Sequence, residues 1–224
     1  MKRLYSIVLI LAVLCMGVFA GCGKADNTDS STNADISVDT LASTDTALKT
    51  EADEIGDDSA RDIDKTLILY FSYSGNTWQI ASWIQEYTGA EMIRLEAAEP
   101  YSDDYDTCVE RAEKEHHDQA RPELKTDVSL ISDYETIILG WPCWNYSCPM
   151  LIRTMLEQYD FSGKTIIPFT TSDASGFSGS LKEMKESSPN AIFEENGLEV
   201  RARDVAEAQG TVDEWLLSLG FIQK

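Results

Sequence analysis

From residue 65 onward, short apolar runs rich in β-branched residues alternate with helix-forming segments. The apolar runs predict strands at 66–71, 91–95, 136–139, 164–169 and 197–200. Helices are expected at 77–87, within 101–119, and at 150–159, 181–186 and 212–219. Strands that alternate with helices and are apolar on both faces predict a parallel sheet covered on two sides. Ligands of such folds bind beyond the carboxyl ends of the strands.

The residues before this pattern have the character of a targeting segment and a spacer. Lys2 and Arg3 precede an uncharged apolar stretch that closes with Gly21 and Cys22. Small residues before a cysteine resemble a bacterial lipobox, so we interpret 1–22 as a lipoprotein signal peptide and Cys22 as the lipidated residue. An uncleaved transmembrane anchor is the alternative. Either way we expect an exported protein held at the bacterial cell membrane, outside the cytoplasm.

Residues 23–64 are rich in Ser, Thr, Asp and Ala, and their apolar residues are scattered without a period. Such a segment cannot bury enough surface to offset its chain entropy, which predicts a disordered acidic linker. Residues 65–224 are then one domain of ordinary size. The formal net charge of −21 argues against nucleic acid as a partner, because binding would need phosphate-neutralising patches.

The cysteines and histidines of this domain suggest no catalytic or metal site. Cys108, Cys143 and Cys148 lack the spacing of a zinc or thioredoxin-type site. A disulfide between Cys143 and Cys148 and buried free thiols both remain open. His116-His117 is the only histidine pair, and a solvated helix face is its favoured interpretation over a catalytic role.

Three loops that follow predicted strands carry the functional signal. In the first, Ser72, Ser74 and Thr77 supply hydroxyl groups, and Gly75 permits a tight turn. The helix that follows points its free N–H groups at an anion. Because the loop contains no Lys or Arg, we expect neutral dipoles to hold the phosphate of a cofactor monoester. A plain strand-to-helix turn with an N-cap is the alternative.

The other two loops suit a flat ring. Residues 140–149 contain three aromatic side chains and two prolines, a rigid platform for stacking. The alternative is that Trp141 and Trp144 fill the edge of the core. Residues 170–180 are rich in hydroxyls and backbone donors, as needed along the polar edge of a heterocycle. A planar ring on a phosphate-bearing tail fits all three loops, and FMN is the obvious candidate.

With these loops the chain closely resembles the flavodoxin family, in particular its exported, lipoprotein-type members. Residues 72–77 resemble the family's phosphate loop, 140–144 its ring-flanking loop, and 160–164 with 168–172 the lead into its third loop. The likeness covers essentially all of 65–224. It implies an α/β flavodoxin-like three-layer sandwich, with a five-stranded parallel sheet of order 2-1-3-4-5, helices on both faces and FMN bound noncovalently.

The resemblance also implies which residues form the FMN site. Those that would hold the phosphate are Ser72, Ser74, Gly75, Asn76 and Thr77. Those that would border the ring are Pro142, Cys143, Trp144 and Asn145, with Trp144 the stacking candidate. Those that would line the other edge are Thr171, Ser172, Asp173, Ser175 and Gly176.

Two departures from the family pattern carry expectations of their own. Relatives often have a second aromatic residue and then Gly after the ring-loop tryptophan, where this chain has Asn145 and Tyr146. We expect Tyr146 to resist a positive φ. Relatives also tend to have Gly-Gly where this chain has Asp173-Ala174. The Asp173 carboxylate would lie near the ring and lower its reduction potential by repulsion.

The favoured function is electron transfer by bound FMN, with the protein positioning and tuning the cofactor. The partner would be another redox protein or a membrane electron-transfer component. One alternative is an FMN-dependent reductase that takes electrons from NAD(P)H and passes them to quinone-type acceptors, although no second nucleotide fingerprint is present. Another is a lipoprotein that binds flavin or a small ligand without a redox role.

Overall fold

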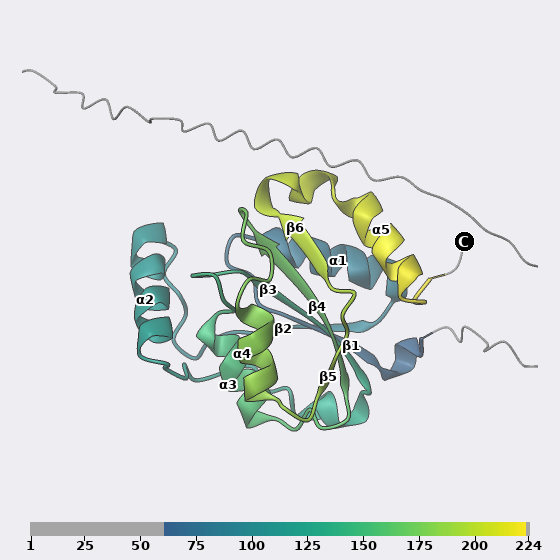
Figure 1. Ribbon diagram of the computed structural model, residues 1–224, viewed down its shortest axis with the longest axis horizontal. Coiled ribbons are helices and arrows are strands. Elements are labelled where there is room, and N and C mark those ends of the chain that lie inside the picture. The colour runs from purple at the N-terminus through teal and green to yellow at the C-terminus, as the bar shows by residue number, and fades with distance from the viewer. Residues whose placement is uncertain (1–60, 223–224) are drawn as a thin grey trace, which may run out of the picture. The chain divides into compact units, whose positions relative to one another are not determined.

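The computed structural model describes residues 61–222, which form a parallel sheet with helices on both faces (Figure 1). The sheet order β2-β1-β3-β4-β5 is the predicted one. The strands are β1 (Thr66–Tyr70), β2 (Glu91–Arg94), β3 (Thr136–Pro142), β4 (Thr165–Ser172), β5 (Ile192–Phe193) and β6 (Leu198–Arg201). The helices are α1 (Asn76–Thr88), α2 (Tyr105–His117), α3 (Met150–Gln158), α4 (Ser180–Ser187) and α5 (Gln209–Ser218). Three short 3₁₀ helices are η1 (Ile63–Lys65), η2 (Ser129–Asp133) and η3 (Ala202–Glu207).

The fifth position of the sheet differs from the prediction of a single strand. Two short strands share it, because β5 pairs with the first half of β4 and β6 with its second half. The predicted strand at 197–200 corresponds to β6. The strands β3 and β4 also run further than predicted, since Pro142 still pairs with Thr171. Part of two candidate binding loops is therefore rigid sheet.

Alternate residues of the central strand β1 enter two separate cores. Leu67 and Leu69 pack with the core under α3 and α4, and Ile68 and Tyr70 pack with the core under α1 and α5. Figure 1 shows these two helix pairs on opposite sides of the sheet, with α2 set apart from it. The helix α2 packs instead against α3.

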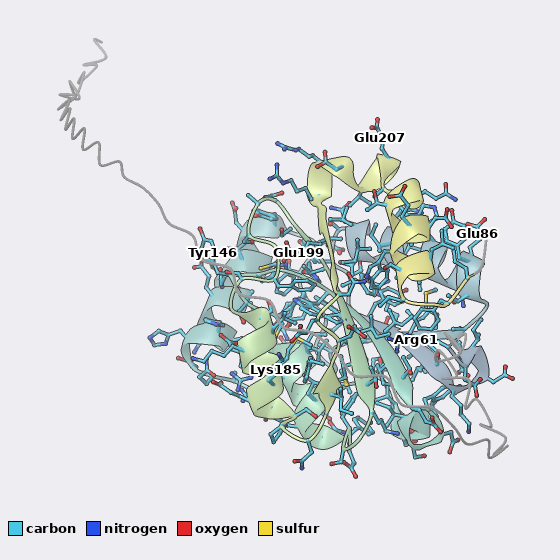
Figure 2. All side chains as sticks on the ribbon, turned by 45° about the vertical axis from the view of Figure 1, so that its right-hand side comes forward. Arg61, Glu86, Tyr146, Lys185, Glu199 and Glu207 are labelled. Carbon is cyan, nitrogen blue, oxygen red and sulfur yellow. The ribbon has the colours of Figure 1, made fainter. Side chains whose placement is uncertain are left out.

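The first described residue is tied to the end of the chain. The Arg61 backbone N–H donates to the carbonyl of Gly220 at 3.0 Å, and its guanidinium donates to Leu219 O at 2.8 Å and to the Glu194 carboxylate at 2.9 Å. Arg61 thus lies near the edge where the strands begin, and Figure 2 shows it far from Tyr146. The predicted signal peptide, Cys22 and nearly all of the predicted linker lie outside the described residues.

Among the helices of residues 61–222, none is long and apolar enough to cross a membrane.

Candidate functional site

The first loop, between β1 and α1, presents unpaired backbone donors. Gly75 precedes α1 with φ = 94°, a left-handed conformation that strains residues with a Cβ. The buried Ser72 Oγ accepts the N–H of Trp78 at 3.2 Å, and Gly75 O accepts that of Gln79 at 2.9 Å. The N–H groups of residues 73–77 donate to no acceptor within the described chain. This donor set suits an anion.

A cation from a neighbouring strand also lies beside this loop. Arg94 Nη2 donates to the Ser72 carbonyl at 2.9 Å. Arg94, Ser72, Ser74 and Gly75 line one hollow of about 360 Å³. The sequence signal was indirect: Arg94 is the last residue of β2, and the parallel register places it opposite Tyr70 at the end of β1. The expectation of neutral dipoles considered only the loop's own residues and did not include this neighbouring cation, so which groups hold a phosphate stays a prediction.

The second loop contains a tight turn at Trp144–Ser147. The N–H of Trp144 donates to Ser147 O at 2.9 Å, and that of Ser147 to Trp144 O at 2.8 Å. The two central residues, Asn145 and Tyr146, have φ of 49° and 61°, as in a type I′ turn. The expectation that Tyr146 resists a positive φ is therefore wrong. Its conformation is held by these two bonds and by the Gly179 N–H, which donates to Tyr146 O at 2.8 Å.

The two tryptophans of this loop differ in environment. Trp141 is fully buried, and its Nε1–H donates to Ser180 Oγ at 3.2 Å, so it fills the core. Trp144 is half-buried beside three aromatic rings. Its ring centroid lies 5.1 Å from that of Tyr101, 5.3 Å from that of Phe71 and 6.0 Å from that of Tyr73, all nearly perpendicular. Trp144 is the one of the pair with surface left for a ligand.

The third loop, between β4 and α4, is braced from within and from β6. Ser172 Oγ accepts the N–H of Gly176 at 2.9 Å. The Glu199 carboxylate accepts the N–H of Phe177 at 2.8 Å, and a Cβ on Gly176 would lie 2.4 Å from a Glu199 oxygen. A side chain at 176 would displace the Glu199 carboxylate, and the φ of 55° at this position also favours glycine. Glu199 was not predicted, because nothing local in the sequence links it to this loop.

Direct contacts bring the three loops together. Thr77 Oγ1 lies 2.8 Å from Thr171 Oγ1, which joins the first loop to the third. The Cys143 N–H donates to Thr171 O at 2.8 Å, and Ser175 Oγ lies 3.3 Å from Cys143 Sγ, which joins the second loop to the third. Ser74, Asn145 and Asp173 are exposed at this edge, Asn76 and Pro142 are half-buried, and Trp144 lies beside Tyr73 of the first loop.

The three cysteines of the described residues are free thiols. Burial raises the pKa of the Cys148 thiol to about 12, and burial also raises the pKa of Cys143 above its ordinary value. Both are therefore protonated near neutral pH and put no thiolate into the site.

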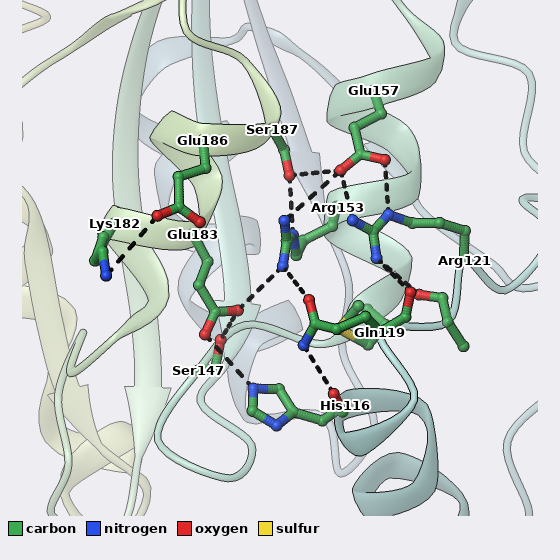
Figure 3. A network of polar contacts seen from close by, with 12 residues as sticks. His116, Gln119, Arg121, Ser147, Arg153, Glu157, Lys182, Glu183, Glu186 and Ser187 are labelled. Atoms are coloured by element: carbon green, nitrogen blue, oxygen red, sulfur yellow. Dashed lines mark hydrogen bonds and ion pairs between the residues drawn. The ribbon is translucent and has the colours of Figure 1, made fainter.

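A charged network lies beneath the turn at Trp144–Ser147, called the ring-flanking turn from here on (Figure 3). The Ser147 hydroxyl donates to the Glu183 carboxylate of α4 at 2.7 Å. That carboxylate is 3.7 Å from the Arg153 guanidinium of α3 and 3.5 Å from His116 Nε2 of α2. Arg153 also donates to Gln119 Oε1 at 2.8 Å. Three helices thus support one hydroxyl of the turn.

The two histidines take different positions in this network. His117 is exposed, as expected for a solvated helix face. His116 is not, because its Nε2 is buried and, within the described residues, has no hydrogen-bond partner. It points at Glu183 in Figure 3, which makes it part of the support for the turn.

Comparison with known proteins gives a consistent result. The family model described as Flavodoxin matches residues 65–217. No curated protein matches the sequence.

Solved structures resemble this chain over nearly their whole length. A candidate flavoprotein from Bacteroides eggerthii is 26% identical with a TM-score of 0.61, and the match covers 71% of this chain and 99% of that one. Another from Bacteroides uniformis is 30% identical with a TM-score of 0.61, covering 68% and 97%. A flavoprotein from Lactobacillus acidophilus, solved in complex with FMN, is 25% identical with a TM-score of 0.54, covering 68% and 98%.

Proposed function

The chain belongs to the flavodoxin family, and we propose that it binds FMN where its three loops meet and transfers electrons outside the cytoplasm. The observation that carries this proposal is the set of unpaired N–H groups at 73–77, with Arg94 beside it and the half-buried Trp144 nearby. Such a site offers donors to a phosphate and an indole to a flat ring. A relative from Lactobacillus acidophilus was solved with FMN, which supports the same ligand here.

Each part of the site has a distinct role in this proposal. The loop N–H groups, the hydroxyls of Ser72, Ser74 and Thr77, and the Arg94 guanidinium would hold the phosphate. The ring-flanking turn would border the ring with Trp144 and Asn145, and donors of the third loop would serve its polar edge. Bound FMN supplies the exchange of one or two electrons. The Asp173 and Glu199 carboxylates near this edge would disfavour added negative charge and lower the reduction potential.

The proposed location follows from the N-terminal sequence. Cys22 would carry a lipid that holds the protein at the membrane, with a redox protein or a membrane electron-transfer component as partner. Cell fractionation with lipid labelling tests the anchor. The wild-type protein is expected to be lipidated and to fractionate with the membranes. The Cys22→Ser variant is expected to carry no lipid and to be either unanchored or left with its signal peptide uncleaved. Identical lipid labelling and fractionation of the two proteins would reject Cys22 as the lipidated residue.

A flavin titration tests cofactor binding directly. FMN is added to the purified full-length protein while the visible spectrum and flavin fluorescence are recorded. Quenched fluorescence with a structured flavin band is the expected result, since the indole and the excluded water change the environment of the ring. Free-flavin fluorescence that is unchanged at micromolar protein would refute the site.

The stacking role of Trp144 has its own test. Trp144→Ala is expected to weaken FMN and riboflavin binding by a similar factor, about tenfold, because it removes a ring contact and leaves the phosphate contacts in place. Trp83→Ala, on α1, is the control for loss of a tryptophan elsewhere. Equal FMN affinity of Trp144→Ala and the parent would reject stacking.

A reductase with a substrate of its own is the second candidate. It is favoured by one observation: a hollow of about 290 Å³ lies between α2 and the ring-flanking turn. A pure carrier has no need of such a space beside the ring. Steady-state turnover with NAD(P)H and a quinone would distinguish a reductase from a carrier.

A further inference from the structure

We propose that the hollow between α2 and the ring-flanking turn binds a small, uncharged, planar hydroxyaromatic molecule, of the phenol, naphthol or hydroquinone class. The hollow has a volume of about 290 Å³, near the lower end of the range typical of small-molecule sites. The inference adds a ligand class to the proposed function. Binding in the hollow stands by itself, and only the statement that the ligand lies beside a flavin rests on the proposed function.

The walls of the hollow fit a flat ring. Tyr73 and Trp144 supply its aromatic lining, and the small residues Cys108 and Ala112 line it from α2, with the Cys108 thiol close to the Tyr73 hydroxyl. Those two are the buried residues of α2, and their small side chains leave the space open. Tyr105, on the first turn of α2, is 68% exposed, a large aromatic surface at the rim with little protein contact. A slot between aromatic and small apolar side chains favours a planar aromatic ligand.

The hollow is preformed, because α2 is fixed near both of its ends. Before the helix, the Tyr73 hydroxyl donates to Ser102 O at 2.9 Å. Within it, Arg111 lies 4.1 Å from the centre of the Tyr101 ring and 2.7 Å from Glu115. At its end, His116 reaches Glu183 across to α4. A ligand would therefore meet a slot that needs little reorganisation.

The polar groups of the hollow select the chemistry of the ligand. Glu113 and Asn145 are its exposed polar lining residues. An ionised carboxylate only accepts hydrogen bonds, and an amide both donates and accepts. A hydroxyl on the ligand can donate to Glu113, whereas a carboxylate or phosphate would be repelled by it. The acidic residues Asp104, Asp106 and Glu110 along α2 add to that repulsion.

The hollow lies on the opposite side of the ring-flanking turn from the third loop. The strand order β1-β3-β4 places the second loop between the first and the third. The third loop meets it from the β4 side, through Ser175 to Cys143 and Gly179 to Tyr146. The residues around the hollow come instead from the β1 loop, α2 and residues 143–145 of the second loop, of which only Cys143 also contacts the third loop. A ligand there and a flavin beside the third loop would share Trp144 as a common wall.

Calorimetric titration with 2-naphthol tests the proposal on the full-length protein, with and without FMN. One molecule is expected to bind to each form. Val109→Trp should fill the slot from its half-exposed position on α2 and weaken 2-naphthol binding at least tenfold, while FMN affinity stays within twofold. Retained FMN binding also shows that this variant is folded.

A surface variant tests the predicted hydrogen bond without risk to folding. Glu113→Gln should weaken 2-naphthol binding about tenfold, as for loss of a charge-assisted bond, and leave binding of 2-methoxynaphthalene unchanged. Glu110→Gln, one turn earlier and outside the hollow, is the matched control and should change neither.

The outcomes separate this proposal from the proposed function. Absence of 2-naphthol binding in both forms, or equal loss in Glu113→Gln and Glu110→Gln, would overturn the proposal even if FMN binds. Displacement of 2-naphthol by FMN would also overturn the proposal, because the flavin ring would then itself bind in the hollow. Failure of FMN to bind while 2-naphthol still binds at the slot would overturn the proposed function alone.

Discussion

The phosphate loop and the ring-flanking turn lie at the same edge of the sheet but are held by different means. The phosphate loop is built from local backbone: one glycine with φ = 94°, a serine that caps an N–H, and a helix that begins at once. The ring-flanking turn relies on side chains from three helices, which meet at Glu183 below Ser147. The first loop is thus mostly local, with Arg94 of β2 beside it, whereas the turn adds side-chain support from three helices to its own backbone hydrogen bonds.

This difference predicts how substitutions in each region affect ligand binding. A change in the phosphate loop should act on the phosphate and spare the ring. A change in the network should alter the whole turn, and with it every ligand that touches the ring side. Comparing FMN with riboflavin, which lacks the phosphate, separates the two effects.

The largest effect is expected from Gly75→Val. A β-branched residue at φ = 94° costs about 1–3 kcal/mol, and relief of that strain would move the loop N–H groups away from the phosphate. FMN affinity should fall about a hundredfold, as for loss of one or two charge-assisted bonds, with riboflavin affinity nearly unchanged. Gly75→Asn is the control, because Asn tolerates this conformation. Parallel losses for both flavins would erase the distinction between the two regions.

Glu183→Ala should have the next largest effect. It removes the acceptor of Ser147 and leaves Arg153, whose side chain is only 10% exposed, with fewer partners. The free energy of unfolding should fall by about 1–3 kcal/mol, and FMN and riboflavin should weaken by the same factor. Denaturant unfolding and flavin titration measure both. Glu186→Ala on the same helix loses only an exposed ion pair and should cost at most about 0.5 kcal/mol.

Tyr146→Asn should stabilise the protein slightly. Tyr146 holds φ = 61° with its side chain 74% exposed, so it bears a backbone cost with few contacts in return. Asn suits this conformation better, and the free energy of unfolding should rise by about 0.5–1 kcal/mol. Asn145→Ala should shift stability in the opposite direction. A loss of stability in Tyr146→Asn would mean that the tyrosine ring holds the turn after all.

The smallest effect concerns thiol reactivity beneath the turn. Burial raises the pKa of Cys148 to about 12, so the thiol is almost entirely protonated at pH 8 and the native protein should resist alkylation there. The half-exposed Cys143 should react first. Mass spectrometry of peptides after brief iodoacetamide treatment measures the order. Faster modification of Cys148 in native protein would show that the network opens readily.

The local apolar patterns predicted the strands and helices, whereas the sheet order came from the resemblance to the flavodoxin family. Prediction from the sequence failed where neighbours in space decide. Arg94 was missed because its place beside Ser72 depends on the register of β1 and β2. The split of the fifth strand was missed because β5 has only two residues, too few to show a pattern, whereas β6 matches the strand predicted at 197–200. The positive φ of Tyr146 was missed because three backbone hydrogen bonds outweigh its residue preference.

The fixation of Arg61 has a mechanical consequence for the domain. Its bonds to Gly220, Leu219 and Glu194 hold the start of the described chain near the edge where β1 begins, while the three loops lie beyond the carboxyl end of that strand. A force applied to the chain before residue 61 would therefore act on the edge of the sheet where the strands begin. The opposite edge, with the three loops, would carry no such force and would stay accessible to a binding partner.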